Sequence, residues 1–380
     1  MSALSSPALV GRQEELLVLE AALAGAAAGE PALVVIGADA GAGKTRLVDE
    51  AGRRARSAGA RLLSGTCLDI GQGGLPFGPV IEALRRFAQE TSEEELVALL
   101  GPAQAEVHRL LPDIVAGTAG SDADGTDQPA TAGARARLFE LLLGLLGRAG
   151  ETAPTLVVIE DVHWIDTASR GLLTFLAHNL SRERVLIVVT HRTDGIGRRH
   201  PLHEYLAELE RHPRVRRLRL PPLRVEETER QLAAILGADP PIDLVGRIQE
   251  QAEGNPFYAE ELLSAWQAGE RVMPRSLRET LSGRLAALEA PAGRLVAAAA
   301  VAGRSSDERL LATVAELPPQ AFLEALREAV DREILVPDEA RGYRFRHALL
   351  RQAALDELLP AERRSLHARV AAVLDEDRSL

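Results

Sequence analysis

The segment IGADAGAGKTRL contains Lys44, the single lysine of a chain with 44 basic residues. An ammonium is a compact charge on a flexible stem, so it suits a narrow anionic site better than the broad fork of an arginine. The surrounding residues follow the phosphate-binding pattern G-x-x-x-x-G-K-[ST], in which backbone N–H groups and the lysine hold phosphates and the hydroxyl binds Mg²⁺. Ala38 replaces the first glycine, with Gly37 one place earlier, and a flexible Gly/Ala turn is the alternative interpretation. The predicted nucleotide-binding residues here are Gly41, Ala42, Gly43, Lys44, Thr45 and Arg46.

Two acidic residues, Glu160 and Asp161, follow the aliphatic segment 156–159. A phosphate-binding loop needs an acidic partner for Mg²⁺ at the end of a neighbouring buried strand. One carboxylate could orient the water shell of the metal and the other could polarise an attacking water, and the sequence leaves open which does which. Both are predicted catalytic residues and, with Thr45, predicted metal ligands. An acidic pair that merely ends a surface strand is the alternative.

Arg192 ends the next apolar segment, RVLIVVTHR. Ligands of open α/β sheets bind beyond the carboxyl ends of the strands, which is where this arginine falls. It is therefore predicted to contact a γ-phosphate and is counted with the catalytic residues. The alternative is a solvated arginine that opens a loop.

A strand must lead into the phosphate-binding loop and a helix must follow it. Residues 32–37 form a short apolar, β-branched segment, and the residues after Lys44 have apolar side chains at helical spacing. A helix N-terminus supplies unpaired N–H groups and a favourable dipole for an anion. Further strands are predicted at residues 60–68, 155–160, 184–192 and 214–220, the last an edge strand with a solvated basic face. Strands that alternate with helices predict a mainly parallel sheet covered by helices.

The pattern changes after Pro222, where only helices are expected until a hairpin with its turn at about residues 338–342. Helices closed by a two-stranded ribbon are typical of a winged helix. The predicted fold is thus an α/β P-loop NTPase with a parallel sheet, followed by a small helical domain and a winged-helix domain. The predicted domains are residues 1–220, 221–275 and 276–359, with 360–380 beginning a repeat-like helical region. Residues 116–133 are small, polar and aperiodic, which predicts a mobile loop.

The net charge of −11 argues against a surface built for non-specific nucleic-acid binding. Cys67 is the only cysteine, so an intrachain disulfide is impossible and a reducing compartment is natural. The N-terminal residues lack the pattern of a signal peptide, and no apolar segment approaches the length of a membrane span. We therefore expect a cytoplasmic protein without membrane contact.

The order of several motifs resembles the signal-transduction ATPases called STAND. The motifs are LVGRQEEL, the phosphate-binding loop, LVVIEDVHWIDTAS, VVTHR, GNPFYAEELL, YRFRHALLRQA and LPAERRSLH. They are most similar to the N-terminal part of the large ATP-binding regulators of the LuxR family (MalT-like proteins), and the resemblance covers essentially the whole chain. It implies a nucleotide-binding domain, a helical domain and a winged-helix domain that hold ADP or ATP between them.

The resemblance also implies roles for individual residues. Val10, Gly11 and Arg12 would lie beside the adenine and ribose, and Arg192 would be the sensor arginine. Pro256 would pack on the adenine from the helical domain, although Gly-Asn-Pro is also ordinary turn chemistry. His347 would reach the β-phosphate from the winged helix; a histidine that caps a helix or lies in the core is the alternative.

The function expected from this resemblance is an ATP/ADP-dependent switch with slow, Mg²⁺-dependent ATP hydrolysis. It would be the regulatory module of a transcriptional regulator, with an inducer or regulatory protein as partner, possible nucleotide-dependent self-association and no DNA binding by this chain. The alternative is an enzyme proper, either an AAA-type motor or a kinase that transfers a phosphoryl group. A scaffold with a structural nucleotide is a third class, and turnover separates the three.

Overall fold

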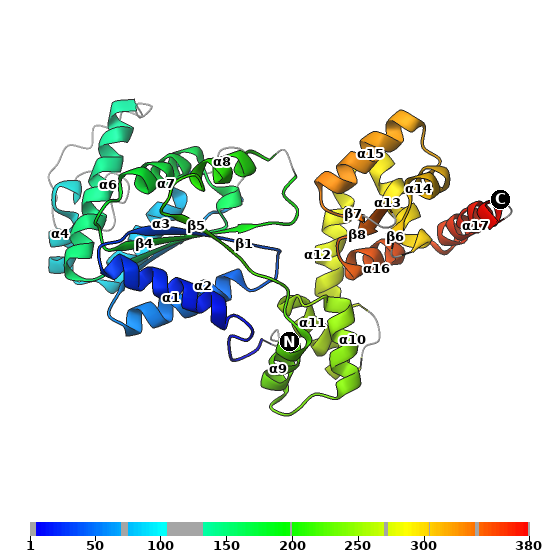
Figure 1. Cartoon of the computed structure of the whole chain (residues 1–380), viewed down its shortest axis with the longest axis horizontal. Coiled ribbons are helices and arrows are strands. Elements are labelled where there is room, and N and C mark those ends of the chain that lie inside the picture. Colours follow the sequence, from blue (N-terminus) through cyan, green and yellow to red (C-terminus); the bar gives the residue numbers. More distant parts are fainter. Residues whose placement is uncertain are drawn as a thin grey trace.

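The computed structural model describes residues 5–69, 75–104, 132–197, 200–269, 273–303, 305–338 and 342–378. Figure 1 shows two lobes, which we call the α/β lobe (residues 5–220) and the helical lobe (residues 221–378). The N-terminal segment runs beside α9 and α11 of the helical lobe. Of the predicted mobile loop, residues 116–131 lie outside the described residues, and residues 132 and 133 belong to the first turn of α6.

The α/β lobe contains one parallel sheet of five strands in the order β2-β3-β4-β1-β5. The strands are β1 (Ala32–Ala38), β2 (Arg61–Thr66), β3 (Thr155–Glu160), β4 (Val185–Arg192) and β5 (Val215–Arg219). All six residues of β3 are buried, as expected for an aliphatic strand covered on both faces. The predicted parallel sheet is confirmed, and β5 is the predicted edge strand with exposed arginines.

Helices cover both faces of this sheet (Figure 1). One face packs against α1 (Gln13–Ala27) and α2 (Lys44–Ser57). The other packs against α3 (Gly78–Glu90), α4 (Glu93–Leu100), α6 (Ala132–Thr152), α7 (Thr167–Asn179) and α8 (Pro201–Leu209). Because apolar side chains of β1 and β4 alternate between the two faces, both cores hold the central strands in place and fix the edge where their carboxyl ends meet.

Cys67 follows β2 and contributes to the second of these cores, with only 3 % of its surface exposed. Burial, together with the nearby charges of Asp166, Asp161 and Glu82, raises the pKa of its thiol to about 12. The thiolate is the reactive form of cysteine, so this thiol is chemically inert near neutral pH.

The helical lobe begins with α9 (Val225–Leu236), α10 (Ile242–Ala252) and α11 (Pro256–Gln267). Its remaining helices are α12 (Arg275–Ala286), α13 (Ala290–Ala302), α14 (Glu308–Ala315), α15 (Pro319–Asp331), α16 (Ala348–Glu357) and α17 (Pro360–Arg378). A single apolar core runs from α9 through α17, so the two halves of this lobe share one interior. The final helix buries Leu366, Val370 and Val373 in that core.

A small antiparallel sheet of order β6-β8-β7 completes the helical lobe. Its strands are β6 (Ser305–Ser306), β7 (Leu335–Asp338) and β8 (Gly342–Phe345). The pairing of β7 with β8 confirms the predicted hairpin, whose residues 339–341 lie outside the described residues. This hairpin leads directly into the start of α16 and so determines where residues 346 and 347 lie.

Among the helices that the structure describes, none combines the length and apolar character needed to cross a membrane.

Candidate nucleotide-binding site

The loop between β1 and α2 wraps around the ammonium of Lys44. Its Nζ donates hydrogen bonds to the carbonyl oxygens of Ala38 at 2.9 Å and Asp39 at 3.0 Å, and only 8 % of the residue is exposed. Burial lowers the pKa of Lys44, although the nearby carboxylates of Asp194, Asp161 and Asp39 oppose the shift. Strand, loop and helix thus take the arrangement that the sequence motif requires.

Glycines give this loop its path. Gly41 and Gly43 have φ values of +78° and +92°, a left-handed conformation that costs other residues roughly 1–2 kcal/mol. A Cβ placed on Gly43 would meet no described atom within 4 Å, so the loop is open at the N-terminus of α2. An open helix N-terminus with an adjacent buried ammonium fits a polyphosphate.

Glu160 at the end of β3 contacts the first turn of α2. Its Oε2 accepts a hydrogen bond of 2.6 Å from Oγ1 of Thr45, and the residue is buried. Burial raises the pKa of Glu160, while the Thr45 hydrogen bond partly offsets the shift. A hydroxyl beside one carboxylate is the kind of partial ligand set that Mg²⁺ takes in phosphate sites, where water and phosphate oxygens complete the octahedron.

Asp161 is more exposed than Glu160. Its φ is +56°, and its backbone N–H donates to Oγ1 of Thr190 at 3.1 Å. About a third of its side chain is accessible, against a buried Glu160. The structure therefore gives the two predicted carboxylates different surroundings, although they are adjacent in sequence.

Arg192 is the only exposed residue of the otherwise buried β4, whose eight residues are all described. It pairs in register with Ala38, the last residue of β1, so it lies at the same edge of the sheet as the phosphate-binding loop. The predicted position at the carboxyl end of the strand is observed.

Residues 10–12 fit between the loop and the helical lobe. Arg12 is 2 % exposed and donates from Nη2 to the carbonyl of Ala42 at 3.1 Å. Gly11 has φ +68°, and a Cβ there would lie 2.6 Å from Cδ2 of Leu223, at the entrance to α9. Burial lowers the pKa of Arg12, which the nearby Glu15 and Glu227 oppose. The position of this segment is thus fixed by both lobes.

Arg46 also links the two lobes, on the outer side of α2. Its Nη1 lies 3.2 Å from Oε1 of Glu260 in α11, and its Nη2 donates to the carbonyl of Ala8. The same Glu260 oxygen accepts from the backbone of Ser6 and from Gln231. The contacts of Arg46 are therefore structural ones in this arrangement.

Pro256 begins α11, and its two neighbours bond to the phosphate-binding loop. Nδ2 of Asn255 donates to the carbonyl of Ala40 at 2.8 Å, and the backbone N–H of Phe257 donates to the carbonyl of Gly41 at 3.3 Å. Asn255 also caps α11. Sequence reasoning singled out Pro256 and missed Asn255, although an Asn before a proline is a recognisable helix N-terminus.

Gly41→Ala should lower the melting temperature more than Gly59→Ala does. Both glycines have positive φ, so each variant places an alanine in the unfavourable left-handed conformation. At Gly41 the new Cβ would also lie 2.8 Å from both Oδ1 of Asn255 and Cβ of Phe257, whereas at Gly59 it would meet nothing described within 4 Å. Thermal melts followed by circular dichroism compare the two, and equal decreases would show that the loop does not support the helical lobe.

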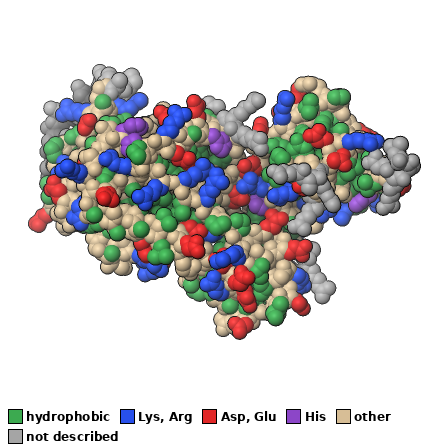
Figure 2. Space-filling model, in the orientation of Figure 1, with side chains coloured by type: hydrophobic (Ala, Val, Ile, Leu, Met, Phe, Trp, Pro, Cys, Tyr) green, Lys and Arg blue, Asp and Glu red, His purple; other side chains and the backbone are tan. Residues whose placement is uncertain are grey.

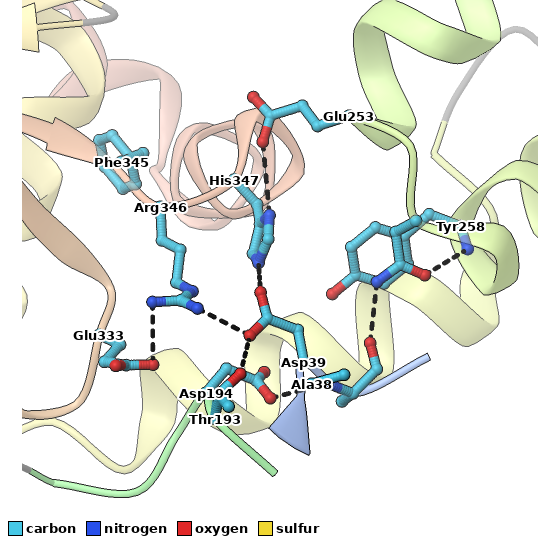
Figure 3. A network of polar contacts seen from close by, with 12 residues as sticks. Ala38, Asp39, Thr193, Asp194, Glu253, Tyr258, Glu333, Phe345, Arg346 and His347 are labelled. Carbon is cyan, nitrogen blue, oxygen red and sulfur yellow. Dashed lines mark hydrogen bonds and ion pairs between the residues drawn. The ribbon is translucent and has the colours of Figure 1, made fainter. Parts of the chain in front are cut away.

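A network of charged residues, which we call the clasp, joins the loop to the helical lobe where the hairpin leads into α16 (Figure 3). Its members are Asp39, Glu253, Glu333, Arg346 and His347. Nη2 of Arg346 lies 2.7 Å from Oδ1 of Asp39, and Nε2 of His347 lies 3.5 Å from Oδ2. Each of these two side chains also contacts a second carboxylate. Glu333 lies 3.1 Å from Arg346, and Glu253 lies 3.3 Å from His347. Figure 2 shows acidic, basic and histidine side chains close together where the lobes meet.

The ionisation of the clasp reflects these contacts. Burial raises the pKa of Asp39, but the contact with His347 and the hydrogen bonds from Thr193 and Arg346 outweigh it and hold the pKa well below its usual range. Burial opposes the charged form of His347, yet the contact with Asp39 and the hydrogen bond to Glu253 raise its pKa. The ring of Tyr258 packs edge-on against His347, with 5.9 Å between centroids. The two pKa shifts thus favour the charged forms of Asp39 and His347, on opposite sides of the clasp.

A second link lies beside the clasp. Oδ1 of Asp194 accepts from the backbone N–H of Ala40 at 2.7 Å, and its Oδ2 lies 3.1 Å from Nη1 of Arg284 in α12. Sequence reasoning identified His347 but missed Asp39, Asp194, Arg284 and Arg346. The acidic residue inside the loop, at a position of the motif that accepts any residue, is the signal that could have drawn attention to Asp39.

Comparison with known families agrees with this geometry. Residues 8–189 match the family described as the AAA ATPase domain, a segment that contains the loop, the acidic pair, three of the five strands of the sheet and the first part of β4. This part of the chain is therefore similar to the AAA ATPase domain, and its sheet and loop have the arrangement of a P-loop fold.

A similar protein aligns with nearly the whole chain. An uncharacterised protein of Rhizobium meliloti (strain 1021) is 28 % identical over 412 residues, which cover 98 % of this chain and 37 % of that protein. The chain thus spans little more than a third of the length of this relative.

Two solved structures are more distant. A STAND protein with a tetratricopeptide repeat sensor from Pyrococcus horikoshii is 16 % identical, with a TM-score of 0.41, over 99 % of this chain and 47 % of its own. The Aeropyrum pernix ORC2 protein, solved as ADPNP–ADP complexes, is 14 % identical, with a TM-score of 0.37, over 98 % of this chain and 97 % of its own.

Proposed function

We propose that the chain is a nucleotide-controlled switch that binds ADP or ATP with Mg²⁺ and hydrolyses ATP slowly. The observation that carries the proposal is the clasp, because Asp39 belongs to the phosphate-binding loop while Arg346 and His347 belong to the helical lobe. A polyphosphate bound at the loop introduces negative charge beside these two cations. It can therefore alter how firmly the lobes hold together, which a site confined to one lobe could not do.

Within this proposal Lys44 and the N–H groups of residues 41–46 hold the phosphates. Thr45 and Glu160 bind the Mg²⁺, since their side chains already touch at 2.6 Å. Mg²⁺, when bound, neutralises charge that develops on the phosphates. The more exposed carboxylate of Asp161 is left to polarise the attacking water, and Arg192 contacts the γ-phosphate. Residues 10–12 and Pro256 surround the base and ribose.

The helical lobe would be the moving part. Residues 221–275 form the helical domain in this proposal, and residues 276–359, with the three-stranded sheet, form a winged helix. His347 is the N-cap residue of α16 at the edge of that unit and would exchange Asp39 for the β-phosphate. Residues 360–380 would begin a further helical region, and the whole would be the regulatory module of a larger LuxR-family (MalT-like) regulator controlled by an inducer or partner protein.

Glu160→Gln and Asp161→Asn should abolish ATP turnover far more than they weaken ADP binding. We expect turnover to fall by about a hundredfold or more, the usual contribution of a positioned acid or base, because metal and water lose their carboxylates. The affinity for ADP should change only a few-fold, since base, ribose and Lys44 contacts remain. Phosphate release and isothermal titration measure the two quantities.

Glu90→Gln is the matched control, because Glu90 ends α3 on the surface in an ion pair with Arg56. It should leave turnover and binding unchanged. Rapid multiple turnover by the unmodified chain would instead favour a motor or a kinase, and a parallel loss of binding and turnover in both site variants would make the acidic pair structural.

A further inference from the structure

His163 is a buried histidine beside the candidate site. It lies in the short 3₁₀ turn η3 (Val162–Trp164) that follows the acidic pair, and 7 % of it is exposed. Neither Nδ1 nor Nε2 has a hydrogen-bond partner among the described residues. Buried polar atoms without partners cost free energy, so such a residue calls for a specific reason.

The carboxylate of Asp161 lies close to this ring. Nδ1 of His163 lies 3.7 Å from Oδ1 of Asp161, just beyond hydrogen-bond range. A movement of about 0.7 Å would bring the two atoms to about 3.0 Å, a normal N–H···O distance. The gap is thus small enough for a rotation of one side chain to close it.

The backbone around Asp161 is held firmly, which leaves its side chain as the part that moves. Asp161 has a left-handed φ of +56°, and its N–H is bonded to Oγ1 of Thr190 on β4. Trp164 packs against the ring of His163 with centroids 5.0 Å apart. The imidazole is therefore fixed in place, and Asp161 can turn toward it or away from it.

A neutral imidazole carries one N–H and one acceptor nitrogen, so the ring of His163 can donate a single hydrogen bond to the carboxylate of Asp161.

We propose that His163 is a positioning residue for Asp161, which it holds by an Nδ1–H···Oδ1 hydrogen bond when Mg²⁺ and nucleotide occupy the loop. The proposal rests on the proposed function, in which Asp161 polarises the attacking water. His163 touches neither nucleotide nor water; it limits the rotation of the carboxylate that does. A histidine that only fills space under the acidic pair is the opposing interpretation.

Two variants distinguish these roles in the full chain. An asparagine amide reaches about as far as Nδ1 and keeps a donor there, whereas a glutamine amide reaches toward Nε2. We expect His163→Gln to reduce kcat for ATP hydrolysis by about tenfold to a hundredfold, the range for a hydrogen bond to a charged group. The KM for ATP and the affinity for ADP should stay within about twofold, and His163→Asn should restore most of kcat. His178→Gln, a surface histidine bonded to the carbonyl of Thr174, is the control and should change nothing.

A second measurement detects the hydrogen bond between His163 and Asp161 and does not depend on ATP hydrolysis. Nitrogen NMR of ¹⁵N-histidine protein with Mg·ADP should show His163, identified from its absence in His163→Gln, as the Nδ1–H tautomer. Asp161→Asn should shift that signal. If both His163 variants lose kcat in proportion to a lower melting temperature, or both keep it, the proposal is wrong. If the unmodified chain shows no turnover but the NMR result is as expected, the hydrogen bond stands and the proposed hydrolysis fails.

Discussion

Lys44→Ala should weaken binding of Mg·ADP by at least about tenfold while the α/β lobe stays folded. Each hydrogen bond between the ammonium and a phosphate oxygen contributes roughly 1.5–3 kcal/mol, and the variant loses all of them. Lys44→Arg should restore little, although it keeps the charge. The ammonium fits between the Ala38 and Asp39 carbonyls with 8 % exposure, and a planar guanidinium is too broad for that space.

Isothermal titration with ADP and Mg²⁺ measures these affinities. Arg53→Ala is the control, because Arg53 lies on the same helix but pairs with Glu50 on the surface. Unchanged ADP affinity in Lys44→Ala would show that the loop is not the nucleotide site. Full recovery of ADP affinity in Lys44→Arg would show that a guanidinium also fits this space, and the loop would remain the nucleotide site.

His347→Ala should speed ADP release by about tenfold to a hundredfold. The loss of one charge-assisted hydrogen bond shifts the equilibrium between joined and separated lobes by roughly that factor. Asp39→Asn should separate the lobes of the nucleotide-free protein, because Arg346 and His347 then lose the carboxylate between them. Stopped-flow release of a fluorescent ADP analogue and the radius of gyration in small-angle scattering follow the two effects.

The control for this prediction is His367→Ala, an exposed histidine of α17 that lies outside the clasp. The isolated residues 1–220 give a second comparison. If the clasp is what mainly slows ADP release, these residues should release ADP as fast as His347→Ala does. Identical release rates for the full chain and His347→Ala would show that His347 serves only to pack the interface.

The clasp should also weaken as the pH rises. The pKa of His347 is raised above its ordinary value of 6.5 in the folded state, so its contribution is complete below pH 6.5 and is lost as the pH rises through the folded-state pKa. The lowered pKa of Asp39 keeps its charge throughout that range. ADP release should therefore accelerate toward alkaline pH in the unmodified chain and be less pH-dependent in His347→Gln.

The parts of this molecule that the sequence alone could predict are local in the chain. The strand, loop and helix around Lys44 and the acidic pair after β3 lie within short segments whose periodicity and glycines are visible directly. The alternation of such segments was enough to predict the parallel sheet. The edge position of β5 followed from its alternating arginines.

The contacts between the lobes could not be predicted in this way. Asp39 and Arg346 are 307 positions apart, and no sequence pattern around either residue predicts that the two are in contact. Asn255 reaches Ala40 across 215 positions because α11, whose apolar face packs in the core of the helical lobe, begins beside the loop. Such pairings depend on how whole helices pack, and hydrophobic periodicity tells only which face of a helix is buried.

The inert thiol of Cys67 makes this chain convenient for labelling. Maleimide dyes react with thiolates, and a buried cysteine whose pKa is about 12 presents almost none of that form at pH 7. Two cysteines introduced on exposed positions, one on α1 and one on α15, would therefore carry a donor and an acceptor dye without removal of Cys67. Energy transfer between them would follow the opening of single molecules in real time, as nucleotide is added and withdrawn.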